Sequence, residues 1–396
     1  MKHYQLPMFA VSILVIIITF FFIPQTYAQQ SQDKFLSFEK PMISGGAEFN
    51  MFLQKQIKSG NLDKINNWDG RIPLKPNEPS AITTFDGFDF DRNTVLTGSR
   101  FIPPDPIGVG GLDRVIAVVN VMIECRNLAG DSLWQDDLAG FFAPLTPANA
   151  TFDPKVIYDQ YEDRFVVVTL EVVNAGTSPN PGNTSRILLA VSKTGAPASA
   201  TGTDWWYFVI NSEESIGGED FWADYPGFAI DEEAVYITAN MFPHQDTVTV
   251  DTSATRLWIV DKGTSGGFYD GSTASFSGPH DFPTISGGFN LTSQPAHVFG
   301  AGGVGGIVGT FLVGFSALSN GTDEFIQIVR VDNPITTPTF STVEFVNIGN
   351  IDNLAGDLLD APQMGPPAII GIEVNNRRAL HSVWRNNSLW LSTTIN

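Results

Sequence analysis

Residues 153–173 read DPKVIYDQYEDRFVVVTLEVV, and this stretch decides the fold class. An Asp-Pro pair opens a run rich in Val, Ile and Tyr, a polar segment interrupts it, and a second run rich in Val and Phe follows. Such runs between turn residues are typical of β-strands, and their continuous apolar character suits strands buried on both faces. The region up to residue 210 predicts four strands: Lys155–Asp159, Arg164–Val172, Arg186–Ser192 and Asp204–Ile210.

The acidic-proline opening recurs before other β-rich runs. It stands at Asp105-Pro106, Asp153-Pro154, Asp224-Tyr225-Pro226, in the degenerate form Gln294-Pro295, and at Asp360-Ala361-Pro362, at intervals of 48, 71, 70 and 66 residues. Proline is tolerated at the first residue of a strand, because its missing N–H lies outside the ladder. Four antiparallel strands per repeat are what a β-propeller blade requires. We therefore predict an all-β chain that forms a β-propeller of five or more four-stranded blades.

The last repeat is the shortest one. Residues 360–396 leave room for about three strands, predicted at Ile369–Val374, Arg378–Val383 and Ser388–Thr394. A ring then needs one more strand, and the N-terminal segment Ile82–Phe88 is the simplest donor. If that segment does not close the ring, the last blade is truncated.

The N-terminus has the pattern of an export signal. Lys2 and His3 precede an apolar run from Met8 to Ile23, and small residues follow where signal peptidase cleaves. We predict a signal peptide at residues 1–28, a helical or extended leader at 29–81 and the propeller at 82–396, secreted or held at the cell surface or in the periplasm. The alternative is an uncleaved membrane anchor, because the apolar run of about 16 residues approaches the length that spans a bilayer.

Charge and cysteine content exclude several classes of protein. The chain has 22 basic and 42 acidic side chains, and residues 29–100 carry nine of each, so the excess acidity belongs to the repeat region. Nucleic-acid binders need a basic footprint to displace counterions, so nucleic acid is not an expected partner. The single cysteine, Cys125, excludes an intramolecular disulfide and a multi-cysteine metal site, and we expect it to be buried in a strand.

Several short motifs occur in the order found in a large group of secreted microbial β-propeller proteins. They are Phe85-Asp86-Gly87, Pro103–Gly110, Asp153–Asp159 with Asp163–Val166, Asp224–Pro226 with Val235–Asn240, and Arg385–Trp390. On these motifs, residues 83–396 resemble that largely uncharacterised group. The resemblance implies an extracytoplasmic, sialidase-like propeller and is nearly silent on activity. The segment Ser192–Trp205 is similar, in a degenerate form, to the Asp-box hairpin of such propellers.

The aspartates that open the repeats are expected to converge at one end of a central channel. They are Asp105, Asp153, Asp224 and Asp360. Four carboxylates in one funnel suit a hard cation such as Ca²⁺. The alternative is that each carboxylate accepts backbone N–H bonds at its own turn. A further pair, Asp89 and Asp91, is expected on one face of a strand, and no cofactor is certain from the sequence.

Aromatic side chains give a second group of candidates. Trp205, Trp222 and Tyr225 are placed where they could stack on sugar rings. The alternative is that they fill the core between blades, because aromatic residues on strands commonly serve as core.

The function that the sequence favours is an extracytoplasmic binding or interaction module for a glycan or an extracellular protein. The alternative is a carbohydrate-active hydrolase or lyase whose site is built from Asp153, Asp224 and His244. Sialidase chemistry needs an arginine cluster, and no arginine triplet stands out in the repeat region. Carboxylates and a histidine within hydrogen-bond reach inside a pocket would support the enzyme, whereas scattered carboxylates would argue against it.

Overall fold

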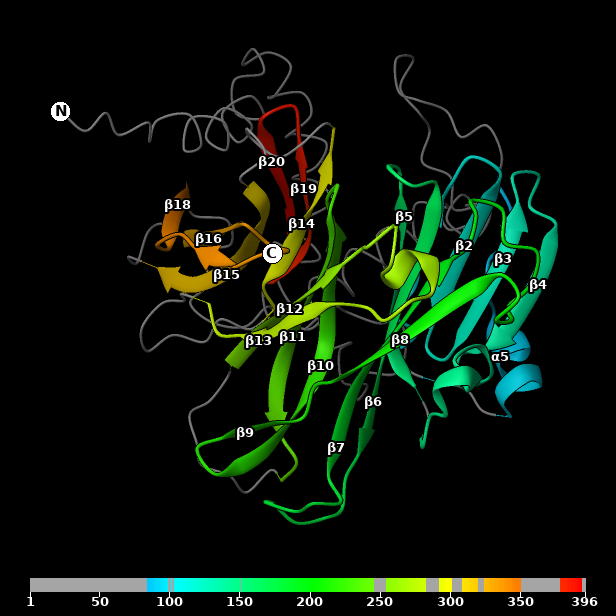
Figure 1. Ribbon diagram of the computed structural model, residues 1–396, viewed down its shortest axis with the longest axis horizontal. Helices are drawn as coiled ribbons and strands as arrows, with labels where there is room; N and C mark the ends of the chain where they lie inside the picture. Colours follow the sequence, from blue (N-terminus) through cyan, green and yellow to red (C-terminus); the bar gives the residue numbers. More distant parts are fainter. Residues whose placement is uncertain are drawn as a thin grey trace, which may run out of the picture.

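The computed structural model describes residues 84–98, 101, 103–149, 151–245, 254–282, 292–300, 308–319, 324–349 and 378–393. The predicted signal peptide, the leader, the strand Ile369–Val374 and Asp360 lie outside these residues. The described chain is mostly β and forms several antiparallel sheets that follow one another across the molecule in chain order (Figure 1). No described helix is both long and apolar enough to cross a membrane.

The strands fall into four sheets within the described residues. The first sheet is β1 (Ile107–Gly110), β2 (Arg114–Val119), β3 (Met122–Asn127) and β4 (Ser132–Asp137), and the second is β5 (Phe152–Asp159), β6 (Arg164–Val173), β7 (Thr184–Ser192) and β8 (Trp205–Asn211). The third is β9 (Glu214–Ile216), β10 (Glu219–Ile230), β11 (Ala234–Pro243), β12 (Ala254–Asp261) and β13 (Phe276–His280). The fourth is β14 (Gln294–Phe299), β15 (Val308–Ser319), β16 (Glu324–Asp332), β17 (Thr339–Phe340), β18 (Glu344–Gly349), β19 (Ala379–Arg385) and β20 (Ser388–Thr393).

Helical segments are few and short. They are α5 (Phe90–Thr97), α6 (Leu138–Phe141), and the 3-10 turns η1 (Ala143–Leu145) and η2 (Phe268–Asp270). In the first and second sheets each strand pairs with its neighbour in sequence. The four strands predicted for residues 155–210 are confirmed, with ends that differ by at most three residues.

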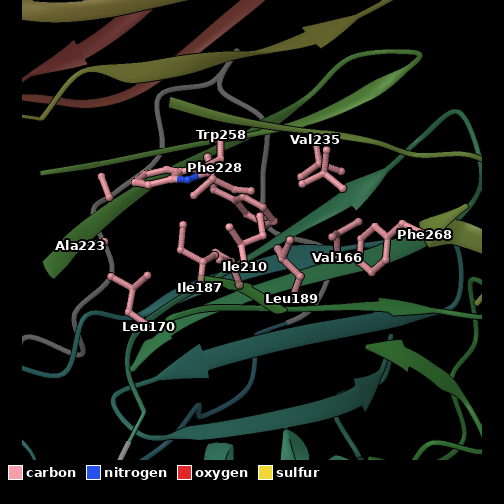
Figure 2. Packing of buried hydrophobic residues seen from close by; sticks show 14 of the residues in the cluster. Val166, Leu170, Ile187, Leu189, Ile210, Ala223, Phe228, Val235, Trp258 and Phe268 are labelled. Atoms are coloured by element: carbon pink, nitrogen blue, oxygen red, sulfur yellow. The ribbon is translucent and has the colours of Figure 1, made fainter. Parts of the chain in front are cut away.

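Each sheet packs its face against the next sheet along the chain. On β6, Val166 and Val168 face a cluster shared with the third sheet, while the intervening Val167 faces a cluster shared with the first. The alternation of side chains along a strand produces this double burial. Figure 2 shows the first of these clusters, with Leu189 of β7 and Trp258 of β12 among its labelled members. Cys125 of β3 is buried in the other cluster, as predicted.

The N-terminal segment differs from the prediction of a closing strand. Residues 84–89 form no strand, and Asp89 instead caps α5 by accepting a hydrogen bond from the backbone N–H of Arg92 at 2.7 Å. The expectation that Asp89 and Asp91 share a strand face is therefore wrong. An aspartate at a helix N-cap satisfies a donor that the helix cannot satisfy itself, and this local signal overrides the apparent alternation. Phe85 lies under the guanidinium of Arg126, 5.3 Å from it, on the first sheet.

The C-terminal hairpin extends the fourth sheet. Strands β19 and β20 lie close to their predicted positions, and β19 pairs in parallel with β14, with Ala296 opposite Ser382 and Phe299 opposite Arg385. The edge of β14 that β15 does not use is therefore hydrogen-bonded to a strand from the end of the chain.

Candidate functional site

Three aspartates that open successive repeats come together at one place. Asp105 precedes β1, Asp153 lies at the start of β5, and Asp224 lies in β10 next to an irregularity that shifts the register before Gly227. Side-chain hydrogen bonds link the carboxyl of Asp105 to that of Asp153, and the carboxyl of Asp153 to that of Asp224. The fourth member, Asp360, lies outside the described residues.

The backbone has a similar left-handed conformation at the start of each of these three repeats. Asp105, Asp153 and Tyr225 have φ of 42°, 48° and 47°, in the left-handed region that aspartate tolerates better than most residues. The backbone N–H of Asp153 donates to Oδ1 of Asn120 at 2.8 Å, and the N–H of Tyr225 donates to Oδ2 of Asp153 at 3.2 Å. The carboxylate of Asp153 thus accepts a backbone N–H of the next repeat, whereas the capping alternative placed each such bond at the aspartate's own turn.

Burial and the closeness of the three carboxyl groups raise the pKa values of Asp105, Asp153 and Asp224. Burial, followed by the neighbouring Asp153, raises the pKa of Asp105 to about 6. Burial, followed by the charge of Asp224, raises the pKa of Asp153 to about 6, and burial also raises the pKa of Asp224. Carboxyls in direct hydrogen bonds cannot all ionise cheaply, so they hold protons that isolated aspartates release.

A cavity of about 290 Å³, here called the mouth, opens beside this cluster. Its walls come from Asp105, Pro106, Ile107, Asp153, Pro154, Lys155, Tyr225 and Leu380. The ring of Tyr225 has Nζ of Lys155 4.9 Å from its centre and the guanidinium of Arg378 5.4 Å from it. Burial lowers the pKa of Lys155 to about 8, even though the charges of Asp153 and Asp105 act to raise it.

A second cavity of about 540 Å³, here called the inner cavity, continues from the mouth and shares Ile107, Lys155 and Leu380 with it. Its walls come from β1, β5, β10, β14 and β19, which include the first strand of the first, second and fourth sheets. The lining residues are Ile107–Gly110, Lys155–Tyr158, Phe228, Gln294, His297, Phe299, Leu380, His381 and Val383.

The three residues that the alternative catalytic function would use do not lie together. His244 lies at the far end of the β10–β11 pair, where its backbone N–H donates to Asp220 and its ring bonds Glu213 at 3.0 Å. Asp224 pairs instead with Asn240, so His244 is four residues, or about 13 Å, along the strand. The structure brings Asp153 and Asp224 together and leaves His244 apart.

Of the three candidate aromatic residues, one lines the mouth and none lines the inner cavity. Trp205 is buried in the core, edge-on to Phe141 with ring centres 4.9 Å apart. Trp222 packs between the rings of Phe152 and Phe242. Tyr225 lines the mouth. For Trp205 the structure supports the core alternative, whereas Trp222 is half-buried and belongs to none of the core clusters of the described residues.

Sequence reasoning missed Lys155, Gln294 and His381. Lys155 stands two residues after Asp153, a spacing that places side chains on one face of a regular strand, but the register of β5 shifts between Phe152 and Lys155. Gln294 occupies the position that aspartate holds in the other openings. His381 belongs to the last hairpin, and only the parallel pairing of β14 with β19 places it beside the other two.

Within the part of the chain that the structure describes, no three His, Cys, Asp or Glu side chains are arranged to hold a metal ion. The aspartates of the mouth bond one another directly.

Comparison with models of protein families, with curated proteins and with solved structures finds no match to this chain.

Proposed function

We propose that the chain is a β-propeller. Two observations support this arrangement: each described sheet packs its face on the next one, and strands from every sheet line the inner cavity. In a propeller the innermost strands of the blades surround a central channel, and the inner cavity would be that channel. The apolar run near the N-terminus and the motifs shared with secreted propellers support a location outside the cytoplasm.

The proposed function is that of an extracytoplasmic binding module that receives a glycan at the mouth. The observation that carries this proposal is the composition of the mouth: carboxyls of Asp105 and Asp153, the ammonium of Lys155 and the ring of Tyr225 converge on one open cavity. Carboxyls and ammonium groups offer acceptors and donors for sugar hydroxyls, and a few such groups in a concave site fix the orientation of a ligand. A segment of an extracellular protein is the competing partner.

A glycoside hydrolase fits this geometry less well. Retaining enzymes hold two carboxyl groups about 5–5.5 Å apart, and inverting enzymes hold them further apart, so that a glycosidic bond fits between them. Here Asp153 bonds directly to Asp105 and Asp224. His244, the third member of the alternative, lies elsewhere. The mouth is therefore better suited to binding a sugar than to placing two carboxyl groups on either side of a glycosidic bond.

A glycan array combined with a reducing-end assay on the mature chain tests this function. We expect specific binding without released product. Leu380→Trp should weaken binding at least tenfold, because Leu380 is exposed and lines both cavities. The matched control is Leu128→Trp, an exposed position in the β3–β4 turn that lines neither cavity, and it should bind as the wild type does.

The same experiment separates the competing functions. Released reducing ends would overturn the binding function in favour of a hydrolase. Binding to no glycan, or glycan binding that Leu380→Trp leaves unchanged, would overturn the placement of a glycan at the mouth.

A further inference from the structure

Two hydrogen-bond donors in the inner cavity have no partner among the residues that the structure describes. The side-chain Nε2 of Gln294 is buried and makes no hydrogen bond. The ammonium of Lys155 makes no hydrogen bond or ion pair with a described residue, and its closest recorded contact is the ring of Tyr225. Buried donors are satisfied in nearly all folded proteins, so the open amide of Gln294, in a cavity that also holds the unpaired ammonium of the half-buried Lys155, points to a ligand that supplies acceptors.

The charge of the inner cavity is opposite to that of the whole chain. The chain carries a formal charge of -20, yet none of the described residues that line this cavity is an Asp or Glu, and Lys155 supplies the one fixed charge among them. Burial lowers the pKa of His297 to about 3, and its ring bonds Gln160 at 3.0 Å, so it is neutral. Burial and the charge of Lys155 lower the pKa of His381 as well.

Apolar side chains form the rest of the wall. Ile107, Val109, Val156, Phe228 and Val383 come from four different strands and enclose a volume in the range of small-molecule sites. A ligand for this cavity therefore needs an apolar body together with a compact anionic group that has at least two acceptor oxygens.

We propose that the inner cavity binds a hydrophobic monocarboxylate. Its carboxylate accepts a hydrogen bond from Gln294 and pairs with the ammonium of Lys155, and its apolar body lies against the aliphatic wall. Anionic acceptors form the stronger class of hydrogen bond, which explains why an amide and an ammonium donor occur together here. This inference goes beyond glycan binding at the mouth and does not depend on it.

Calorimetric titration of the mature chain with decanoate tests the proposal, with decan-1-ol as the ligand that has the same chain and no charge. We expect decanoate to bind with a Kd in the micromolar range and at least tenfold more tightly than decanol. Lys155→Met keeps the length of the side chain and should weaken decanoate at least tenfold while leaving decanol unchanged.

Lys193→Met is the matched control. Lys193 also lies over an aromatic ring, 3.6 Å from the centre of Trp206, but it lines neither cavity, and its loss should leave decanoate binding unchanged. Gln294→Met is the second variant and should weaken decanoate about fivefold without affecting decanol, so the proposal can still be tested if Lys155→Met fails to fold.

Three results would overturn the proposal: no binding of decanoate at millimolar concentration, equal affinity for decanol, or unchanged decanoate affinity in both variants. Failure of glycan binding at the mouth would be a separate result, because Leu380→Trp and the glycan array report on it independently of Gln294.

Discussion

Strand β5 connects two clusters that each contain aspartate, lysine and tyrosine. In one cluster the lysine is hydrogen-bonded and ion-paired, and in the other it has neither kind of partner among the described residues. At its end, Asp159 accepts Nζ of Lys262 at 2.6 Å and the hydroxyl of Tyr269 at 2.7 Å. At its start, Lys155 stands beside Asp153 with no hydrogen bond or ion pair to a described residue.

The cluster around Lys262 is closed. Its ammonium also donates to the backbone carbonyl of Asp231, and Asp231 accepts the hydroxyl of Tyr236 at 2.6 Å and the backbone N–H of Ala234 at 2.7 Å. These bonds join the second sheet to the third. A buried polar network in which each member is satisfied stiffens a core, whereas an open one is available to a ligand. The cluster around Lys262 therefore stabilises the fold, and the cluster around Lys155 is the one that we propose binds a ligand.

The largest expected effect comes from removing the two lysines in turn. Lys262→Met leaves Asp159 buried without its counter-charge and should lower the free energy of unfolding by about 3–5 kcal/mol. Lys155→Met should lower it by less than about 1 kcal/mol, since no pairing is lost. Urea denaturation of both variants measures the difference, and equal losses would contradict the distinction between the clusters.

The second expected effect is a dependence of the unfolding free energy on pH, caused by the aspartates of the mouth. The pKa values of Asp105 and Asp153 are about 6, above the ordinary aspartate value of 3.8. The folded chain therefore holds protons that the unfolded chain has released, and the stability this gives is complete below pH 4 and is lost as the pH rises through 6. Lys155, with a pKa of about 8, stays charged over most of this range.

The variant Asp153→Asn measures how much of this pH dependence comes from Asp153, because asparagine does not ionise. Asparagine tolerates the left-handed backbone and can still accept the N–H of Tyr225. Relative to the wild type, the variant should gain on the order of 2 kcal/mol in unfolding free energy between pH 4.5 and 7.5, after allowance for partial exposure. Denaturation at several pH values gives this difference, and parallel curves for the two proteins would show that Asp153 ionises normally.

The sequence predicted the strands and the meeting of the aspartates for the same reason. Long apolar runs such as Arg164–Val173 must be buried on both faces, and a repeated opening places equivalent residues at equivalent points. Asp105, Asp153 and Asp224 are brought together by that equivalence. Prediction worked where a pattern repeated along the chain.

The remaining features depend on contacts that no local pattern encodes. Residues 89–91 fit both the alternation of a strand and the start of a helix, and in the structure Asp89 is the N-cap of α5. His244 was grouped with Asp153 and Asp224 as the alternative catalytic site, whereas strand register separates it from Asp224. Gln294 and His381 meet only because β19 returns to pair with β14, a pairing between residues more than 80 positions apart.

The smallest expected effect compares two tyrosine hydroxyls. The hydroxyl of Tyr236 bonds Asp231 in the closed cluster, whereas that of Tyr225 makes no hydrogen bond with a described residue. Tyr236→Phe should cost about 1 kcal/mol, because the carboxylate of Asp231 loses one bond but still accepts the backbone N–H groups of Glu233 and Ala234. Tyr225→Phe should change stability by less than about 0.5 kcal/mol, since no hydrogen bond is lost. Thermal unfolding of the pair at one pH measures both values, and a greater loss at Tyr225 would mean that the mouth, too, is held together by its polar groups.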